Sequence, residues 1–279
     1  MKPTFDHNLI GSFMLWFDNK LLTKGEAFTN HSSLFYPTAS HLSGSFYSSP
    51  FRQFVSDYSV SGAIIPSGVY ADTVFTSRGT SGLKIDFNNG RVIFNNGITP
   101  AVVSGDYAIK DFNVYYTNEP EEQILFQTKY HLRPKTFEAL SGLEEGDKTF
   151  PSIFIKYNEG TNKPVAFGGM DSSNVEFQAI VLADSNYGLE GVCSIFRDTA
   201  RSNFGLFSGS QFPYDYYGDF KSGLFNYNDL INSGPCNGMY IHEVSVSKLS
   251  EKVNTDVNVK CFAAIIDFKL QIYRYPRQE

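Results

Sequence analysis

The sequence predicts an α+β fold that is predominantly β, with mixed or antiparallel sheets and a few helices. Short apolar runs with a two-residue period alternate with Gly-, Pro-, Asn- and Asp-rich turns through most of the chain, as expected for strands. Phe and Tyr, which favour strands, number 26 and 17. Residues 6–24 and 185–201 instead carry apolar side chains at three- and four-residue steps, which is typical of amphipathic helices.

The first predicted element is the helix over 6–24. Leu9, Phe13 and Phe17 share one broad apolar face, and Gly25 is a favourable place for the helix to stop. Residues 26–62 are rich in Ser, Asn, Tyr and Pro, and their apolar residues have no sustained period. We therefore expect this segment to be a long arm that follows the surface.

Residues 81–97 predict a β-hairpin. Alternation places three apolar side chains on one sheet face, and these are Leu83, Ile85 and Phe87. Asn89-Gly90 tolerates the two positive φ angles of a type I′ turn, so the chain can reverse in two residues. Such a turn implies two same-face pairs across the strands, Phe87 with Val92 and Ile85 with Phe94.

A turn signal at 118–120 separates this β-rich part from a second α+β part, so we expect domains at 1–119 and 120–279. In the second, a strand runs directly into the clearest helix of the chain, 185–201, which Asp184 or Ser185 can cap. Residues 203–238 are loop-like. The other predicted elements are strands at 124–126, 152–157, 174–182, 239–247 and 257–275, and a short helix at 136–140.

Composition excludes several classes of protein. The net charge is −6 and no basic cluster is present, so binding to a phosphate backbone is not expected. The first residues do not form a signal peptide, and residues 9–22 are too short and too polar to span a bilayer. Charged residues make up 19% of the chain. This low value suits either a surface that is buried against partners or a thick β core.

Catalytic and metal-binding motifs are missing from the sequence. The histidines have neither His-x-His nor His-Glu-x-x-His spacing, and there is no Gly-x-Ser-x-Gly, Gly-x-Gly-x-x-Gly or P-loop pattern. The three cysteines are scattered without metal spacing and are expected to be reduced, buried thiols. We predict no catalytic residue, no cofactor and no metal site. The histidines are His7, His31, His41, His131 and His242, and the cysteines are Cys193, Cys236 and Cys261.

Carboxylates and tyrosines gather in one loop, residues 214–220. Acids beside aromatic rings suit a carbohydrate-binding loop or a glycosidase subsite, but Asp in a Gly- and Tyr-rich loop is also ordinary turn chemistry. A calcium site built from Asp215, Asp219 and Asp229 would lack EF-hand spacing.

Charged residues near the end of the 185–201 helix form either a solvated face or an intersubunit ion pair. Cys193 on the same helix is expected to be a core or interface thiol. Together with the loop tyrosines, the charged residues make the candidate interface set, which is Arg197, Asp198, Arg201, Tyr214, Tyr216 and Tyr217.

One segment carries a resemblance to a known family. Residues 175–192, Val-Glu-Phe-Gln-Ala-Ile-Val-Leu-Ala-Asp-Ser-Asn-Tyr-Gly-Leu-Glu-Gly-Val, followed by Ser-Ile-Phe-Arg-Asp at 194–198, resemble the βα unit of tailed-phage neck and tail-terminator proteins. The closing run 264–270 is similar to the strand that completes their sheet. Residues 81–94 look like hairpins of marine-phage virion proteins.

The resemblance implies a structural protein that forms a ring, most often hexameric, between head and tail. It implies contacts with further copies of the chain and with neighbouring tail-tube, sheath or neck proteins, in a virion assembled in the host cytoplasm. DNA would pass through the lumen without specific binding, because an acidic lumen repels phosphate. The chain is longer than simple tail terminators, and the first 120 residues are then an added β domain that grips sheath or head.

Two other interpretations stay open. The first is a β-sandwich module of a virion or cell surface that recognises glycans or a receptor through residues 203–238. The second is a glycoside hydrolase that uses Asp215 or Asp219 with a distant Glu, the two carboxylates lying roughly 5–10 Å apart.

Overall fold

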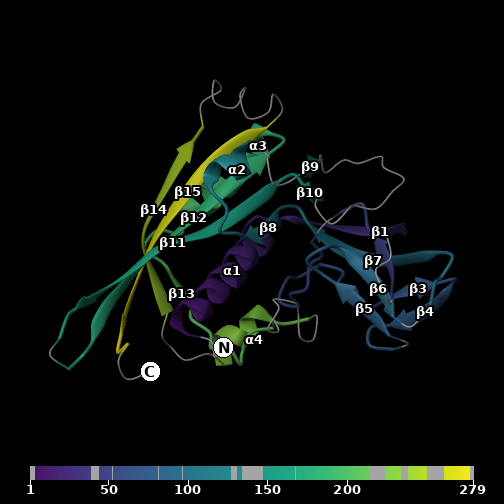
Figure 1. The fold of residues 1–279 in the computed structure, drawn as a ribbon, viewed down its shortest axis with the longest axis horizontal. Coiled ribbons are helices and arrows are strands. Elements are labelled where there is room, and N and C mark those ends of the chain that lie inside the picture. The colour runs from purple at the N-terminus through teal and green to yellow at the C-terminus, as the bar shows by residue number, and fades with distance from the viewer. Residues whose placement is uncertain are drawn as a thin grey trace.

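The computed structural model (Figure 1) describes residues 4–38, 44–51, 53–80, 82–95, 97–126, 131–133, 147–166, 168–213, 224–233, 238–249 and 261–276. These residues form two large sheets with helices packed mainly on one of them. The predicted class, α+β and predominantly β, is confirmed. Among the described helices there is none long and apolar enough to cross a membrane.

The first sheet has seven antiparallel strands in the order β4-β3-β7-β1-β2-β6-β5. It lies at the right of Figure 1. One face of this sheet contributes to a hydrophobic core, which includes Phe35, Tyr47, Phe54, Phe87 and Tyr107. The strands are β1 (Phe28–Thr38), β2 (Gly44–Ser48), β3 (Gly68–Ala71), β4 (Val74–Ser77), β5 (Leu83–Asp86), β6 (Arg91–Asn95) and β7 (Val103–Lys110).

The prediction of a surface arm over 26–62 is wrong. β1 is a central strand that pairs with β7 through residues 28–35 and with β2 through residues 36–38. Phe35, Tyr47 and Phe54 are all buried. Their spacing in sequence has no period because two of them lie in β1 and β2, while Phe54 lies in the segment after β2 and forms a single bridge with Ile109. The partners that bury them lie far along the chain, so a local pattern does not reveal the burial.

The hairpin at 81–97 is confirmed in its faces but not in its register. Leu83, Ile85 and Phe87 are buried together as expected. The observed loop is longer, because four residues, 87–90, follow the last pair, Asp86 with Arg91. The observed cross-strand pairs are Ile85 with Val92 and Leu83 with Phe94.

Tertiary contacts explain why the type I′ turn does not form. Phe87 leaves the ladder to enter the core, and its carbonyl accepts a hydrogen bond of 2.8 Å from the backbone N–H of Phe54. The Asp86 carboxylate accepts from both the backbone and the side-chain amide of Asn89. Within the loop 87–90 only Gly90 has a positive φ, 60°. Burial of one phenyl ring therefore outweighs the two-residue turn preference of Asn-Gly.

The second sheet has six strands in the order β13-β14-β15-β12-β11-β8. All neighbours are antiparallel except β8 and β11. The strands are β8 (Asn113–Tyr116), β11 (Ser152–Pro164), β12 (Asp171–Ala183), β13 (Asn203–Gly205), β14 (Gly238–Lys248) and β15 (Phe262–Arg274). A small parallel pair, β9 (His131–Arg133) and β10 (Asp147–Thr149), stands apart.

Helices α1 (Phe5–Lys24) and α3 (Asn186–Arg197) cover one face of the second sheet, here called the inner face. Aromatic rings fill the contact: Phe13 stacks on Phe177 at 4.3 Å between centroids, and Phe17 stacks on Phe196 at 3.7 Å. α2 (Glu121–Leu125) packs part of the opposite, outer face. Leu22 of α1 also joins a small cluster with Val55 of the first sheet's side, so α1 contacts both halves of the molecule.

The predicted helix over 6–24 is confirmed by α1. α3 begins as predicted, with the Ser185 hydroxyl accepting from the Gly188 N–H at 3.1 Å, but it ends at Arg197 rather than at residue 201. Residues after Asp198 form turns, and Arg201 has a positive φ of 64°, which a helix does not allow. The strands predicted at 152–157, 174–182 and 239–247 are present and longer than predicted. That at 257–275 appears as β15 from Phe262, with residues 257–260 outside the described ranges.

Two other local predictions are wrong. Residues 124–126, expected as a strand, lie in and just after α2, because Pro120 at its N-cap and two glutamates in its first turn favour a helix start. The 203–238 region, expected as loop, contains β13 and α4 (Tyr227–Ser233). The helix predicted at 136–140 lies outside the described residues.

The domain division at 119/120 stays a prediction. α1 and β8 precede it in sequence, yet both belong to the second sheet's layer, since α1 packs in its core and β8 pairs with β11. The chain therefore enters at the second sheet, builds the first sheet, and returns to complete the second.

Candidate interaction surfaces

The described residues show no arrangement suited to metal binding. No group of three or more His, Cys, Asp or Glu side chains among them is placed to hold a metal ion. Cys193 and Cys261 are free and buried. Burial raises the pKa of the Cys261 thiol to about 11 and also raises the pKa of Cys193. Both thiols are therefore protonated near neutral pH and are poor nucleophiles.

A groove of about 510 Å³ lies beside the C-terminal end of α1. Among the described residues of its lining Glu26 is the ionisable one, so they supply no pair of groups for general acid–base chemistry. The lining residues are Leu22, Thr23, Glu26, Phe28, Ser59, Val60 and Ser61.

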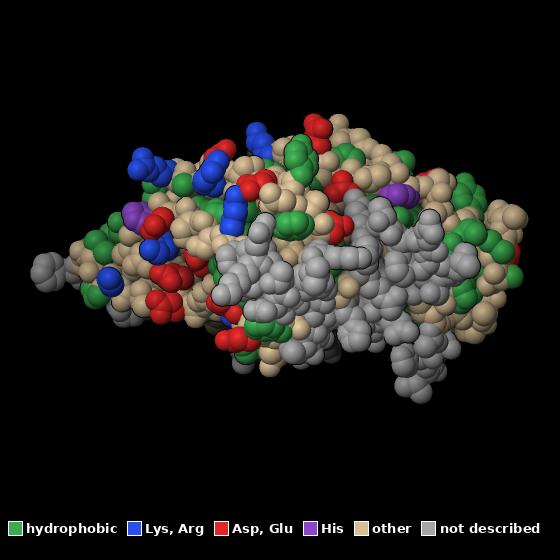
Figure 2. Space-filling model, turned by 90° about the horizontal axis from the view of Figure 1, so that it is seen from above, with side chains coloured by type: hydrophobic (Ala, Val, Ile, Leu, Met, Phe, Trp, Pro, Cys, Tyr) green, Lys and Arg blue, Asp and Glu red, His purple; other side chains and the backbone are tan. Residues whose placement is uncertain are grey.

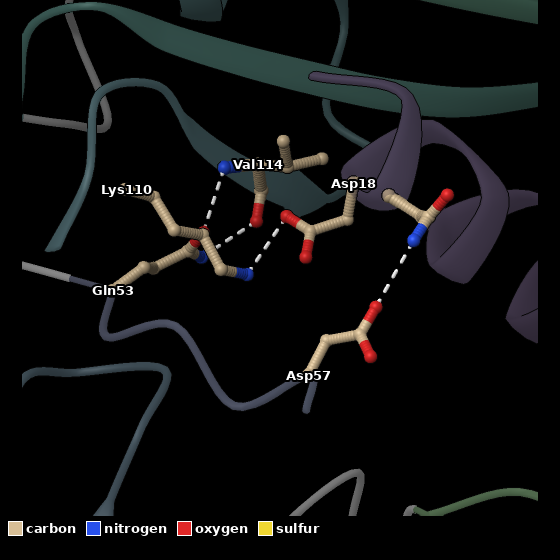
Figure 3. A network of polar contacts seen from close by, with 6 residues as sticks. Asp18, Gln53, Asp57, Lys110 and Val114 are labelled. Carbon is tan, nitrogen blue, oxygen red and sulfur yellow. Dashed lines mark hydrogen bonds and ion pairs between the residues drawn. The ribbon is translucent and has the colours of Figure 1, made fainter. Parts of the chain in front are cut away.

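A buried polar network joins the two sheets (Figure 3). The Lys110 ammonium at the end of β7 donates to the Asp18 carboxylate of α1 at 2.7 Å, and the two side chains are 9% and 15% exposed. Desolvation raises the pKa of Asp18 even though Lys110 opposes the rise. The Asp57 carboxylate accepts from the Asn19 side chain at 3.0 Å and from the Tyr227 N–H at 3.0 Å. We assign this network to fixing the relative position of the sheets.

Among the described strands, two edges of the second sheet have a strand neighbour over only part of their length. β8 pairs with β11 only at residues 152–155, and residues 158–164 are all exposed. We call residues 158–164 the β11 edge. β13 pairs with β14 only at residues 238–240. We call residues 242–248 the β14 edge. Among the described strands, only β15 pairs with this segment.

The β11 edge belongs to a projecting hairpin. β11 and β12 run together from Ser152–Leu182 to Pro164–Asp171 and extend past the helices at the lower left of Figure 1. The base is anchored, because Tyr157 packs edge-on to Phe177 and its hydroxyl donates to Asp6 of α1. Toward the tip the inner face becomes polar, and the Arg274 guanidinium and the Asn162 side chain both bond the Ser173 hydroxyl.

Charged side chains cross the outer face of this sheet in one row. Pairing places Glu159, Glu176, Lys269 and Glu243 side by side on four neighbouring strands. The Lys269 ammonium bonds Glu243 at 2.9 Å and lowers the pKa of that carboxyl. Figure 2 shows acidic and basic side chains mixed over this half of the molecule, with apolar side chains gathered at the opposite end.

The apolar end belongs to the first sheet. Phe75, Tyr70 and Leu34 lie in one row across β4, β3, β7 and β1, and each is between 44% and 49% exposed. The rings of Tyr70 and Phe75 meet edge to face at 5.3 Å. Exposed aromatic rings in a row are typical of protein contact surfaces.

The sequence-predicted interface residues have different outcomes. Arg197 and Asp198 are exposed neighbours at the end of α3, with 3.8 Å between Nε and Oδ1. The backbone N–H of Arg201 donates to the Ile241 carbonyl at 2.8 Å, which places Arg201 at the start of the β14 edge. Tyr214, Tyr216 and Tyr217 lie outside the described residues, as do Asp215 and Asp219. Asp229, proposed with them as a calcium ligand, lies in the first turn of α4.

The open edges were not found by sequence reasoning. A strand's pattern of residues reveals which face is buried, but not whether its edge has a neighbour.

No family model matches the chain, and no curated protein matches it.

Proposed function

We propose that this protein is a structural component of a tailed-phage virion, which assembles with further copies of itself into a ring at the neck or tail end. It works through protein–protein contacts and not as an enzyme. The observation that carries the proposal is the projecting β11–β12 hairpin, whose outer strand is exposed along residues 158–164.

The hairpin extends beyond the core that holds its base. β15 pairs with β12 as far as Arg274 with Asp171, so the extension has three strands and β11 is its edge strand. Here the inner face past Tyr157 and Val175 carries polar side chains, Asn162, Ser173 and Arg274. A partner strand that pairs with the exposed edge of β11 continues the sheet there, which is the role of such an edge in an assembly.

Two further features support a virion protein. The strand–helix unit that resembles phage neck and tail-terminator proteins is present as β12 followed by α3, with β15 pairing along β12. The net charge of −6 would let a ring of copies surround DNA without holding it. We place the protein in the virion, in contact with tail-tube, sheath or neck proteins, after assembly in the host cytoplasm.

Mass photometry and negative-stain electron microscopy of the purified full chain test the proposal. We expect closed rings of discrete mass. A variant that replaces residues 162–173 with Asn-Gly joins Thr161 to Asn174, which face each other across the hairpin. We expect this variant to keep its far-ultraviolet circular dichroism and to lose the rings.

Proteomics of purified virions provides the second test. We expect the chain among the particle proteins. A chain that stays monomeric at all concentrations and is absent from particles contradicts the proposal.

A further inference from the structure

We infer that neighbouring copies join edge to edge: the β11 edge of one copy pairs antiparallel with the β14 edge of the next, so that the six-stranded sheet continues from copy to copy. The inference rests on the proposed function and identifies the two surfaces that form its ring contact.

Within the described residues both edges present free backbone groups, except that Pro164 at the end of the β11 edge has no N–H to donate. The β11 edge is exposed at every residue from 158 to 164, and within the described ranges only β12 pairs with it. The β14 edge pairs with β15 on one side. On the other side the last backbone bonds end at Ile241, which Arg201 and Ser202 contact. Unpaired strand edges are ready to accept another strand.

The two edges fit each other in length and in their blocked ends. Residues 158–164 and 242–248 are segments of equal length. β8 pairs with β11 at residues 152–155, before the β11 edge begins. β13 pairs with β14 at residues 238–240, before the β14 edge begins. In an antiparallel pair these two short strands lie at opposite ends of the contact, so neither one obstructs the docking strand.

Direction and facing also agree. β14 is antiparallel to β15, β15 to β12, and β12 to β11, so β14 already runs opposite to β11 within one copy. A second copy in the same orientation therefore brings its β11 antiparallel to β14. Its outer face then continues the outer face of the first copy, and its inner face continues the inner face.

Charge selects one register. Lys163 and Glu243 both lie on the outer face, since Lys163 follows Glu159 and Thr161 in the same alternation and Glu159 shares the charged row with Glu243. Placing Lys163 opposite Glu243 sets Thr161 opposite Ser245 and Gly160 opposite Val246. Opposite charges meet on the outer face, and the residue without a side chain faces the valine on the inner face.

The contact is heterologous, because one copy offers β11 and the other offers β14. Such contacts form a closed ring when the rotation between copies completes a circle. The twist between adjacent strands supplies a rotation at every contact. Charged side chains on both edges oppose pairing in other registers, which protects free copies from random edge association.

Disulfide trapping tests the pairing. The double variant Thr161→Cys/Ser245→Cys puts one thiol on each edge at facing positions. Under mild oxidation we expect covalent dimers and higher ladders on non-reducing gels. Thr161→Cys/Tyr58→Cys is the matched control, since Tyr58 is 56% exposed and belongs to no strand of the second sheet. The unsubstituted chain under the same oxidation gives the background from its own cysteines.

Charge reversal gives an independent readout. Lys163→Glu and Glu243→Lys should each weaken self-association by roughly two- to tenfold, measured by mass photometry against concentration. The double reversal should restore it. Lys156→Glu is the matched control, because Lys156 lies on the same strand before the β11 edge begins.

The outcomes separate the two proposals. Edge pairing is overturned, while the proposed function stands, if the unsubstituted chain forms rings but the Thr161→Cys/Ser245→Cys variant cross-links no more than the control and charge reversals have no effect. If the unsubstituted chain is monomeric at all concentrations, both proposals are contradicted. Cross-linking specific to the facing positions, with rescue by the double reversal, supports edge pairing.

Discussion

The side-chain amide of Gln53 hydrogen-bonds both backbone polar groups of Val114. The Val114 N–H donates to Oε1 at 2.9 Å, and Nε2 donates to the Val114 carbonyl at 2.6 Å. Gln53 thus hydrogen-bonds the edge of β8 that faces away from β11, as a neighbouring strand would. These bonds connect the first sheet's side of the molecule to the second sheet (Figure 3). Both partners are buried, so water cannot replace these bonds.

We expect Gln53→Ala to lower the free energy of unfolding by about 2–4 kcal/mol, because it leaves a buried N–H and a buried C=O without partners. Urea unfolding followed by circular dichroism measures the change. The control is Lys84→Ala at an exposed position of β5, with an expected change within about 0.5 kcal/mol. Equal losses of stability in the two variants would contradict a structural role for the Gln53 side chain.

Lys110 neutralises a carboxylate that burial disfavours. Lys110→Met is expected to destabilise the fold by about 3–5 kcal/mol at pH 7, because Asp18 is then a buried charge with no partner, near the second carboxylate of Asp57. Thermal or urea unfolding measures the loss. The double variant Asp18→Asn/Lys110→Met removes both charges and should recover most of it. No recovery in the double variant would contradict this explanation.

The pH dependence follows from the same pair. The pKa of Asp18 in the folded protein is raised above its usual 3.8, so the folded state binds this proton more tightly than the unfolded state. The ionised carboxyl therefore costs stability above the folded pKa, and the cost diminishes as pH falls through that pKa toward 3.8. We expect the Lys110→Met defect to be smaller at pH 5 than at pH 7. A defect that grows on acidification contradicts the sign of the shift.

Phe13 is the centre of the aromatic contact between α1 and the second sheet. It is fully buried, stacks on Phe177 at 4.3 Å, and meets Phe268 edge to face at 5.2 Å. Phe13→Ala is expected to cost about 3–5 kcal/mol, seen as a lower Tm. Phe75→Ala, the same substitution at a 49% exposed ring, should leave Tm nearly unchanged.

Gly90 is the loop residue that must be left-handed. Its φ of 60° costs an L-residue about 1–2 kcal/mol, and more for a β-branched side chain. Gly90→Val is therefore expected to destabilise the first sheet, whereas Gly90→Asn, whose side chain tolerates this conformation, should cost less. Chemical denaturation of the two variants checks the order. A Val variant as stable as the Asn variant would contradict the left-handed loop.

Some features of the fold could be predicted from local patterns. The α1 periodicity, the alternation in β5 and β6, and the Ser185 cap of α3 each depend on residues close in sequence. The register of the 81–97 hairpin could not be predicted, because Phe87 is drawn into a core that includes Phe54. The strands β1 and β2 were missed for the same reason.

The candidate surfaces divide in a similar way. The sequence indicated that Arg197, Asp198 and Arg201 are surface charges, and the structure shows Arg197 and Asp198 exposed. It did not indicate that Arg201 marks the beginning of an open strand edge. That depends on the short length of β13 and on the distant pairing of β14 with β15.

By itself the sequence determined that this chain is predominantly β with helices at 6–24 and near 186, because amphipathic period and turn chemistry act over a few residues. Only the tertiary structure decided which strands are neighbours, that α1 packs between the two sheets, and which edges stay open. Those outcomes depend on how distant apolar faces meet and on which backbone groups find partners, and neither is written in any local run of residues.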